Sequence, residues 1–197
     1  VSPCFPEFIT SSWQDPEGHI AVLNQLRENE EFDQYYISRY ADLMNTVFHE
    51  DSILTFLDSM AMTIEPEMTQ HVARWGGSYL EWQHNVGKVE SFIMTRNSIL
   101  NDGLIDCYSL SGPYEFSFQV EPEGAGLIQV NSVIPETYPW TANYFGGVDL
   151  LLEAIETSAE WEFESWSTNN HTPSPSSTDD VITIDPFSDD EITAHFI

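Results

Sequence analysis

The sequence has very little positive charge. It contains five Lys and Arg residues against 33 Asp and Glu, which gives a formal net charge of -28 at pH 7. All five basic residues come before residue 97, so the last hundred residues hold 18 carboxylates and no Lys or Arg. A protein that binds a polyanion needs Lys and Arg to displace counterions from phosphates. The composition therefore argues against nucleic acid and anionic lipid as partners, and it favours either solubility in a salty environment or binding of cations.

The sequence also lacks a long hydrophobic run. No apolar stretch approaches the roughly 20 residues that span a bilayer, and none has the layout of a signal peptide, so we expect no membrane insertion. The first residues, VSPCFPEF, are typical of a loop. We therefore expect the chain to be cut from a longer polypeptide.

Cysteine is scarce, and its spacing fits no metal knuckle or redox CxxC motif. Cys4 and Cys107 are either two buried thiols or one disulfide bridge from the N-terminal loop to the end of the helical region. A bridge would close a loop of about 100 residues, which the chain-entropy model values at about 4.7 kcal/mol.

Motifs that carry catalysis are missing as well. The glycines of EGAG and YFGG fit turns rather than a phosphate-binding loop. Lys88, the only lysine, is expected on the outward side of a helix, which argues against a role in holding ATP. The six histidines show no HExxH or paired metal spacing, and Asp106 beside Cys107 should raise the pKa of that thiol. We assign no catalytic or cofactor-binding residue to this segment.

Helical periodicity fills the first part of the chain. In residues 29–47, capped by Asn29, apolar residues recur at three- and four-residue steps and predict an amphipathic helix. A second helix follows from a cap at Asp51, and Pro66 should end it or begin the next one. The apolar stripe predicted for residues 29–47 is Phe32, Tyr36, Tyr40, Leu43 and Val47.

The segment HVARWGGSYLEWQHNV at residues 71–86 admits two interpretations. The density of His, Arg and Trp is compatible with an active site. However, Gly76-Gly77 is typical of a helix end, and Ser78 with Glu81 forms the S-x-x-E capping box of a new helix. We favour a corner between two helices, with Trp75 and Trp82 packed across it.

From residue 112 the periodicity becomes that of strands. YEFSFQVEP alternates apolar and polar residues, and about five further short segments do the same between turns. We predict an α+β fold, in which an all-helical subdomain at residues 1–111 precedes a small antiparallel β domain of about six strands at residues 112–197. The join would lie at Ser111-Gly112-Pro113.

Two weaker patterns lie in the β domain. The carboxylates of Asp185, Asp189, Asp190 and Glu191 suggest a calcium site, although solvated acidic turns explain them better. Several aromatic residues suit a sugar-stacking platform, although strand alternation favours the core for most of them. These aromatic residues are Tyr138, Trp140, Tyr144, Trp161 and Trp166.

Three stretches resemble a known family. They are YYISRYADLMNTVFHEDSILTFLDSM, IEPEMTQHVARWGGSYLEWQHNV and LIDCYSLSGPY. They resemble the C-terminal helical region of CotH-type proteins, the family of spore-coat protein H and its secreted bacterial relatives. The family pattern is matched by Tyr36, Ile37, Arg39 to Leu43, Asn45, Thr46, Pro66 to Met68, His71, Arg74 and Trp75. The strands that follow resemble β repeat-like domains of exported proteins.

The resemblance implies a kinase-like parent protein that uses ATP with Mg or Mn, with its nucleotide and metal residues upstream of the part matched. It also implies export to the surface or medium of a bacterium, which strengthens a Cys4–Cys107 bridge. We expect a non-catalytic segment whose helices brace the upstream kinase-like core, and whose β domain contacts cell-surface proteins or polysaccharide. A kinase-like enzyme and a calcium- or carbohydrate-binding module remain the alternatives.

Overall fold

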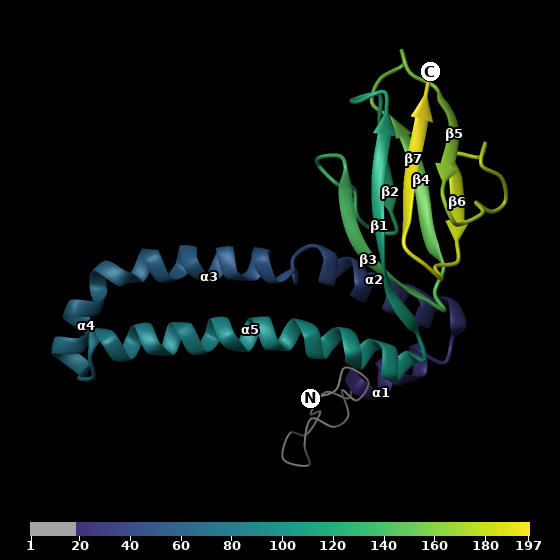
Figure 1. Cartoon of the computed structure of the whole chain (residues 1–197). Helices are drawn as coiled ribbons and strands as arrows, with labels where there is room; N and C mark the ends of the chain where they lie inside the picture. The colour runs from purple at the N-terminus through teal and green to yellow at the C-terminus, as the bar shows by residue number, and fades with distance from the viewer. Residues whose placement is uncertain (1–18) are drawn as a thin grey trace. The chain divides into compact units, whose positions relative to one another are not determined.

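The computed structural model describes residues 19–197 and confirms the predicted α+β fold (Figure 1). The helices are α1 (His19–Leu26), α2 (Glu30–Asn45), α3 (Glu50–Ile64), α4 (Met68–Trp75) and α5 (Tyr79–Tyr108), and the 3-10 turn η2 (Glu65–Glu67) separates α3 from α4. The strands are β1 (Ser111–Glu121), β2 (Gly126–Val130), β3 (Trp140–Gly146), β4 (Leu150–Glu156), β5 (Phe163–Thr168), β6 (Val181–Ile184) and β7 (Asp190–Phe196).

The described chain divides into two compact units. Residues 19–42 together with Gly103–Ile197 form one, here called the sandwich unit, and Leu43–Asp102 form the other, here called the hairpin unit. The predicted boundary at residues 111 and 112 follows the change from helix to strand, whereas these units follow packing. In the packing division, α1, most of α2 and the end of α5 belong with the strands.

Two sheets make up the β part of the sandwich unit, with strand orders β3-β1-β7-β5 and β2-β4-β6. Alternate residues of each sheet are buried between them, such as Phe116 and Phe118 of β1 against Leu152 of β4 and Ile182 of β6. All pairings are antiparallel except that of β1 with β7, which is parallel. The described chain has seven strands instead of about six, because β3 was not predicted.

Helices close one end of the sandwich unit. Ile37 and Ala41 of α2 and Leu104 of α5 belong to the same buried cluster as the strands. The guanidinium of Arg27, just after α1, lies over the rings of Tyr36 and Tyr108, 5.3 and 4.6 Å from their centroids. The fully buried residues of α2 in this unit are Ile37, Ala41 and Asp42. Of the predicted stripe, Tyr36 and Tyr40 pack half-buried against the core, whereas Val47 is exposed.

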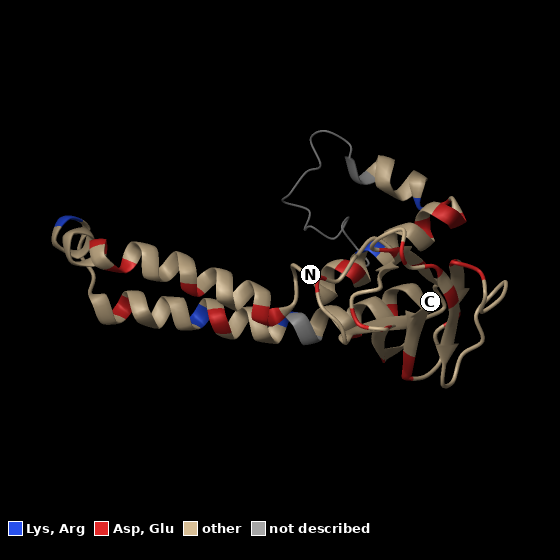
Figure 2. Ribbon diagram, turned by 90° about the horizontal axis from the view of Figure 1, so that it is seen from above, with Lys and Arg blue, Asp and Glu red and all other residues tan. Residues whose placement is uncertain are grey.

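In the hairpin unit, α3 and α5 run antiparallel and side by side, joined through η2 and α4 (Figures 1 and 2). Acidic residues occur at intervals along both helices (Figure 2). Among the described side chains between Glu50 and Asp102, only Met68 is buried. Within residues 19–197 no helix is long and apolar enough to cross a membrane.

Candidate functional site

A buried carboxylate organises the contact between α2 and the strands of the sandwich unit. Asp42 lies on the buried face of α2, between Ala41 and Met44, and its side chain is fully buried. It faces the turn after β2, where Asn131 has a positive φ of 49°. A charge at such a position is costly unless hydrogen bonds replace the lost water.

Four donors satisfy Asp42. The hydroxyl of Tyr144 donates to Oδ1 over 3.1 Å, and Asn131 Nδ2 donates to the same oxygen over 3.3 Å. The backbone N–H of Ser132 donates to Oδ2 over 3.0 Å, and the Ser132 hydroxyl donates to Oδ2 as well. Arg39, one turn before Asp42 on α2, donates through Nη1 to the Ser132 hydroxyl over 2.6 Å. Arg39, Ser132 and Asp42 thus form a continuous chain of charge-assisted hydrogen bonds.

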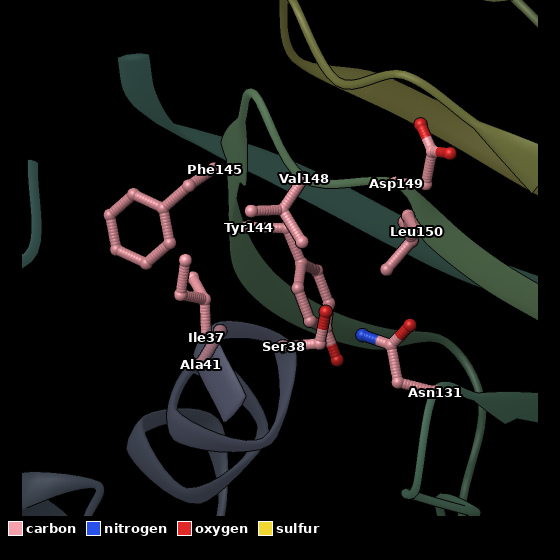
Figure 3. A pocket seen from close by; sticks show the side chains of 9 residues that line it. All are labelled: Ile37, Ser38, Ala41, Asn131, Tyr144, Phe145, Val148, Asp149 and Leu150. Carbon is pink, nitrogen blue, oxygen red and sulfur yellow. The ribbon is translucent and has the colours of Figure 1, made fainter. Parts of the chain in front are cut away.

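An open pocket of about 280 Å³ lies beside this chain of hydrogen bonds. It is lined by Gln34, Tyr35, Ser38, Arg39, Asp42, Asn131, Ser132, Asp149 and Leu151. A much smaller cavity of about 10 Å³ lies where Ile37 and Ala41 of α2 face Tyr144 and Phe145 of β3 (Figure 3). Apolar contacts between α2 and β3 therefore lie next to the polar cluster.

The chemistry of this cluster favours a structural clamp over catalysis. The Ser132 hydroxyl donates its hydrogen to Asp42 and accepts one from Arg39. A nucleophilic serine needs a base that can take its proton and then release it, usually a histidine. The pocket lining contains no histidine. Arg39 and Asp42, both in the family pattern, hold the turn after β2 against α2.

A second buried polar cluster joins β7 to the loop after β5. The carboxylate of Asp190 accepts the N–H groups of Asn169, His171 and Glu191 over 2.7 to 3.0 Å. His171 Nδ1 donates to it over 2.6 Å, while His171 Nε2 accepts the Phe187 N–H over 3.2 Å. Both ring nitrogens are therefore used, with Nδ1 bonded to the carboxylate and Nε2 as the acceptor. Burial acts to raise the pKa of Asp190, but the donated hydrogen bonds outweigh it and lower that pKa.

The candidate calcium ligands are spread over separate contacts. Asp190 is surrounded by N–H donors, Asp189 accepts the Glu115 N–H over 2.9 Å, and Glu191 accepts from Gln119 Nε2 over 2.5 Å. Asp185 is exposed. Within residues 19–197, no group of three or more His, Cys, Asp and Glu side chains is placed to hold a metal ion. The calcium site stays a prediction, and the geometry favours capping of backbone N–H groups for Asp189 and Asp190.

The aromatic residues considered for sugar stacking lie in or against the core. Tyr144 and Trp166 are buried, whereas Tyr138, Trp140 and Trp161 are half-buried against the same cluster. The Tyr138 hydroxyl accepts the Ile128 N–H over 2.6 Å, and burial raises the pKa of Tyr138. The favoured interpretation of these residues as core is confirmed for Tyr144 and Trp166.

The segment at residues 71–86 is a corner, as predicted. α4 ends at Trp75, Gly76 and Gly77 have φ of 85° and 87°, and Ser78 Oγ accepts the Glu81 N–H over 3.1 Å at the start of α5. The predicted packing of Trp75 on Trp82 is wrong, because Trp75 is 70% exposed and lies under Arg74. The ring beside Trp82 is that of Tyr79, 5.4 Å away.

Three further predictions have different outcomes: the disulfide is untested, one helix cap is wrong and another is confirmed. Cys4 lies outside the described residues, so its bridge to Cys107 of α5 stays a prediction. Asp51 does not cap α3, since the helix begins at Glu50 and has no side-chain cap. Asn29 does cap α2, because its Oδ1 accepts the Phe32 N–H over 2.9 Å.

Sequence reasoning matched Arg39 and Asp42 to a family pattern but gave neither a role. No local signal pointed to Asp42, because it lies about 100° around α2 from Ala41 and outside the stripe of Ile37, Ala41 and Met44. Its partners Ser132 and Tyr144 lie 90 and 102 residues along the chain. No local pattern links such distant positions.

Comparison with known proteins supports a CotH-type region. Residues 7–100 match the model of a family described as CotH kinase protein. This span contains the stretches at residues 36–46 and 66–75 that carried the resemblance. No curated protein and no solved structure matches the chain.

Proposed function

We propose that this chain is the non-catalytic C-terminal part of an exported, CotH-like bacterial protein. Its hairpin unit braces a kinase-like core that precedes it in the parent protein, and its sandwich unit contacts cell-surface proteins or polysaccharide. The family match at residues 7–100 supports the first part of this proposal. The observation that carries it is the exposed apolar surface of the hairpin unit.

That surface is extensive for two helices in water. Phe56 is 64% exposed, Leu80 75% and Phe92 65%. The other exposed apolar side chains of the unit are Val47, Phe48, Met60, Met62, Ile64, Trp75, Tyr79, Val89, Met94 and Ile99. Large contiguous apolar surfaces on a folded protein mark the places where it contacts a partner.

The energetics support the same conclusion. Most helical stability in proteins comes from packing of an apolar face, and ordering each residue costs about 1–2 kcal/mol of backbone entropy. Between Glu50 and Asp102 the described side chains offer one fully buried residue, Met68, and otherwise only half-buried ones such as Leu57, Trp82 and Val86 to offset this cost. Fully burying a Phe or Leu side chain contributes about 1.5–3 kcal/mol, so a covering partner would supply what the hairpin lacks.

The sandwich unit, unlike the hairpin unit, has a well-buried apolar core. Its strands share one well-buried cluster with α2 and α5, and Asp42 fixes the turn after β2 to α2. It is therefore held to the helix that carries the family pattern rather than tethered through a free linker. Its surface bears carboxylates and, after residue 96, no Lys or Arg. Such a surface suits contacts with basic or neutral partners.

Phosphotransfer belongs, in this proposal, to the parent protein. The family description supports a kinase-like parent, for which ATP and Mg or Mn are the proposed cofactors. The residues of this chain fit those groups poorly. Lys88 lies exposed in the middle of α5, 3.5 Å from Asn85 Oδ1, and no cluster of metal ligands occurs among residues 19–197. We derive no catalytic step from them.

The test compares this chain with a longer polypeptide that includes the upstream sequence of the parent protein. Thermal unfolding of both is measured with and without Mg-ATP. A ligand present at 100 times its Kd stabilises the native state by about 2.7 kcal/mol, which raises the melting temperature. We expect a rise for the longer polypeptide alone. A rise for this chain by itself would refute the non-catalytic assignment.

The bracing role is tested with the exposed face of the hairpin. The double variant Phe56→Ser, Phe92→Ser should leave the stability of this chain unchanged and lower that of the longer polypeptide by about 3–6 kcal/mol, since two buried aromatic rings are lost. Ile134→Ser, at an exposed apolar residue of the sandwich unit, is the matched control. Equal effects of the two sets on the longer polypeptide would refute bracing by the hairpin.

A further inference from the structure

A groove of about 370 Å³ lies between the two long helices of the hairpin unit. Asp58 and Met62, four residues apart on one face of α3, line one wall together with Glu65 of η2. Phe56 and Met60, each two residues from Asp58, lie about 200° around α3 from it. The groove is therefore distinct from the side of α3 that carries Phe56 and Met60, although Met62 belongs both to the groove and to the exposed apolar set.

α5 supplies the opposite wall. Trp82, Val86 and Glu90 recur every four residues and line the groove from that side. Trp82 and Val86 are half-buried, so their apolar surface is only partly covered by α3. The groove thus combines an apolar floor with carboxylates from both helices.

Those carboxylates have few partners. Glu65 accepts the hydroxyl hydrogen of Tyr79. Asp58 and Glu90 make no hydrogen bond or ion pair with the described part of the chain, and no Lys or Arg lines the groove. Glu90 is nevertheless half-buried beside apolar side chains. A partner that covered this apolar floor with apolar groups alone would remove water from unpaired carboxylates, which is unfavourable.

The occupant must therefore bring positive charge together with apolar surface. An Arg side chain meets both needs, because its planar guanidinium stacks on an indole ring such as that of Trp82 and donates to carboxylates on either side. A second copy of this chain is a poor occupant, because its net charge of -28 would repel the same carboxylates.

We propose that this groove receives a basic amphipathic helix of a protein partner, with an Arg side chain between Asp58 and Glu90 over Trp82. A third helix is the natural occupant, since helices pack 8–10 Å apart along the grooves between neighbours. The inference rests on the proposed function in one respect: the helix belongs to the kinase-like core that the hairpin braces.

The test uses the whole chain and a synthetic 14-residue helical peptide of Leu, Ala and Arg, with Arg on one face. A peptide in which Gln replaces every Arg is its control. Binding is followed by NMR through the indole N–H of Trp82, assigned with Trp82→Phe. Two double variants each remove two negative charges: Asp58→Asn with Glu90→Gln in the groove, and Asp179→Asn with Asp180→Asn in the sandwich unit.

We expect the Arg peptide to shift the Trp82 signal and to bind at least tenfold more weakly to the groove variant, while the sandwich variant binds it normally. The Gln peptide should bind at least tenfold more weakly to the unmodified chain. Equal binding of the two peptides, equal losses in the two variants, or an unshifted Trp82 signal would each overturn the proposal. None of these outcomes bears on Phe56 and Phe92, so bracing by the exposed face is tested independently.

Discussion

Replacing Asp42 with alanine should lower the free energy of unfolding of the sandwich unit by about 3 kcal/mol or more. The substitution removes the acceptor of four hydrogen bonds at a fully buried position. An orphaned buried donor costs about 1–3 kcal/mol, and breaking a buried charged network about 3–5 kcal/mol. Ser132 is exposed and can regain water, whereas Tyr144 is buried and cannot. The loss should therefore lie toward the lower end of the range for a network.

Urea unfolding followed by near-UV circular dichroism measures this loss, and hydrogen exchange of the Ser132 amide localises it. Asp149→Asn is the matched control, because Asp149 lines the same pocket, is exposed, and makes no hydrogen bond within the described residues. We expect the control to change stability by less than about 0.5 kcal/mol. If Asp42→Ala costs no more than this control, or if Ser132 stays protected from exchange, the reasoning about the clamp is wrong.

Three further outcomes follow from the sandwich unit. Burial, with the neighbouring Tyr36, raises the pKa of Tyr108 to about 12. Because this folded pKa exceeds the unfolded pKa of about 10, the stability that Tyr108 contributes is present below about pH 10 and is lost as the pH rises to about 12. Tyr108→Phe should remove that loss and one tyrosine ionisation near pH 12 from an ultraviolet titration. The pKa of Asp190 is lowered in the folded state, so the stability that Asp190 contributes is present above its unfolded pKa of about 3.9 and is lost as the pH falls through the folded pKa. In Asp190→Asn, stability should therefore depend less on pH in the acid range, as measured by circular dichroism. A Cβ at Gly126 would clash with the edge of the Phe196 ring, so Gly126→Ala should lower the free energy of unfolding in urea by about 1–3 kcal/mol. An unchanged urea midpoint would contradict this packing.

Local signals predicted the helix boundaries well where a side chain caps the backbone. Asn29 at the start of α2 and Ser78 at the start of α5 act within three residues along the chain, so their patterns are complete in the sequence. The end of α5 was harder. Asn101-Asp102-Gly103 has the composition of a helix end, yet α5 continues through it. Burial of Leu104 against the strands carries the helix on to Tyr108.

Distant contacts explain what the sequence could not predict. The inward alternation of β3 is carried partly by the small residues Ala142 and Gly146, which gives a weak strand pattern, and YFGG was interpreted as a turn. The parallel pairing of β1 with β7 joins residues about 75 positions apart. The role of Asp42 depends on Ser132 and Tyr144, so the candidate site itself became visible only in the folded chain.

The order β3-β1-β7-β5 places the last strand in the middle of its sheet. A ribosome releases β1 well before β7, with roughly 70 residues between them, which at 5–20 residues per second leaves one edge of β1 open for about 4 to 14 seconds. Open strand edges are sites of aggregation, and charged side chains are one of the devices that protect them. The run of 18 carboxylates without a single Lys or Arg in this part of the chain supplies mutual repulsion between nascent chains during that interval.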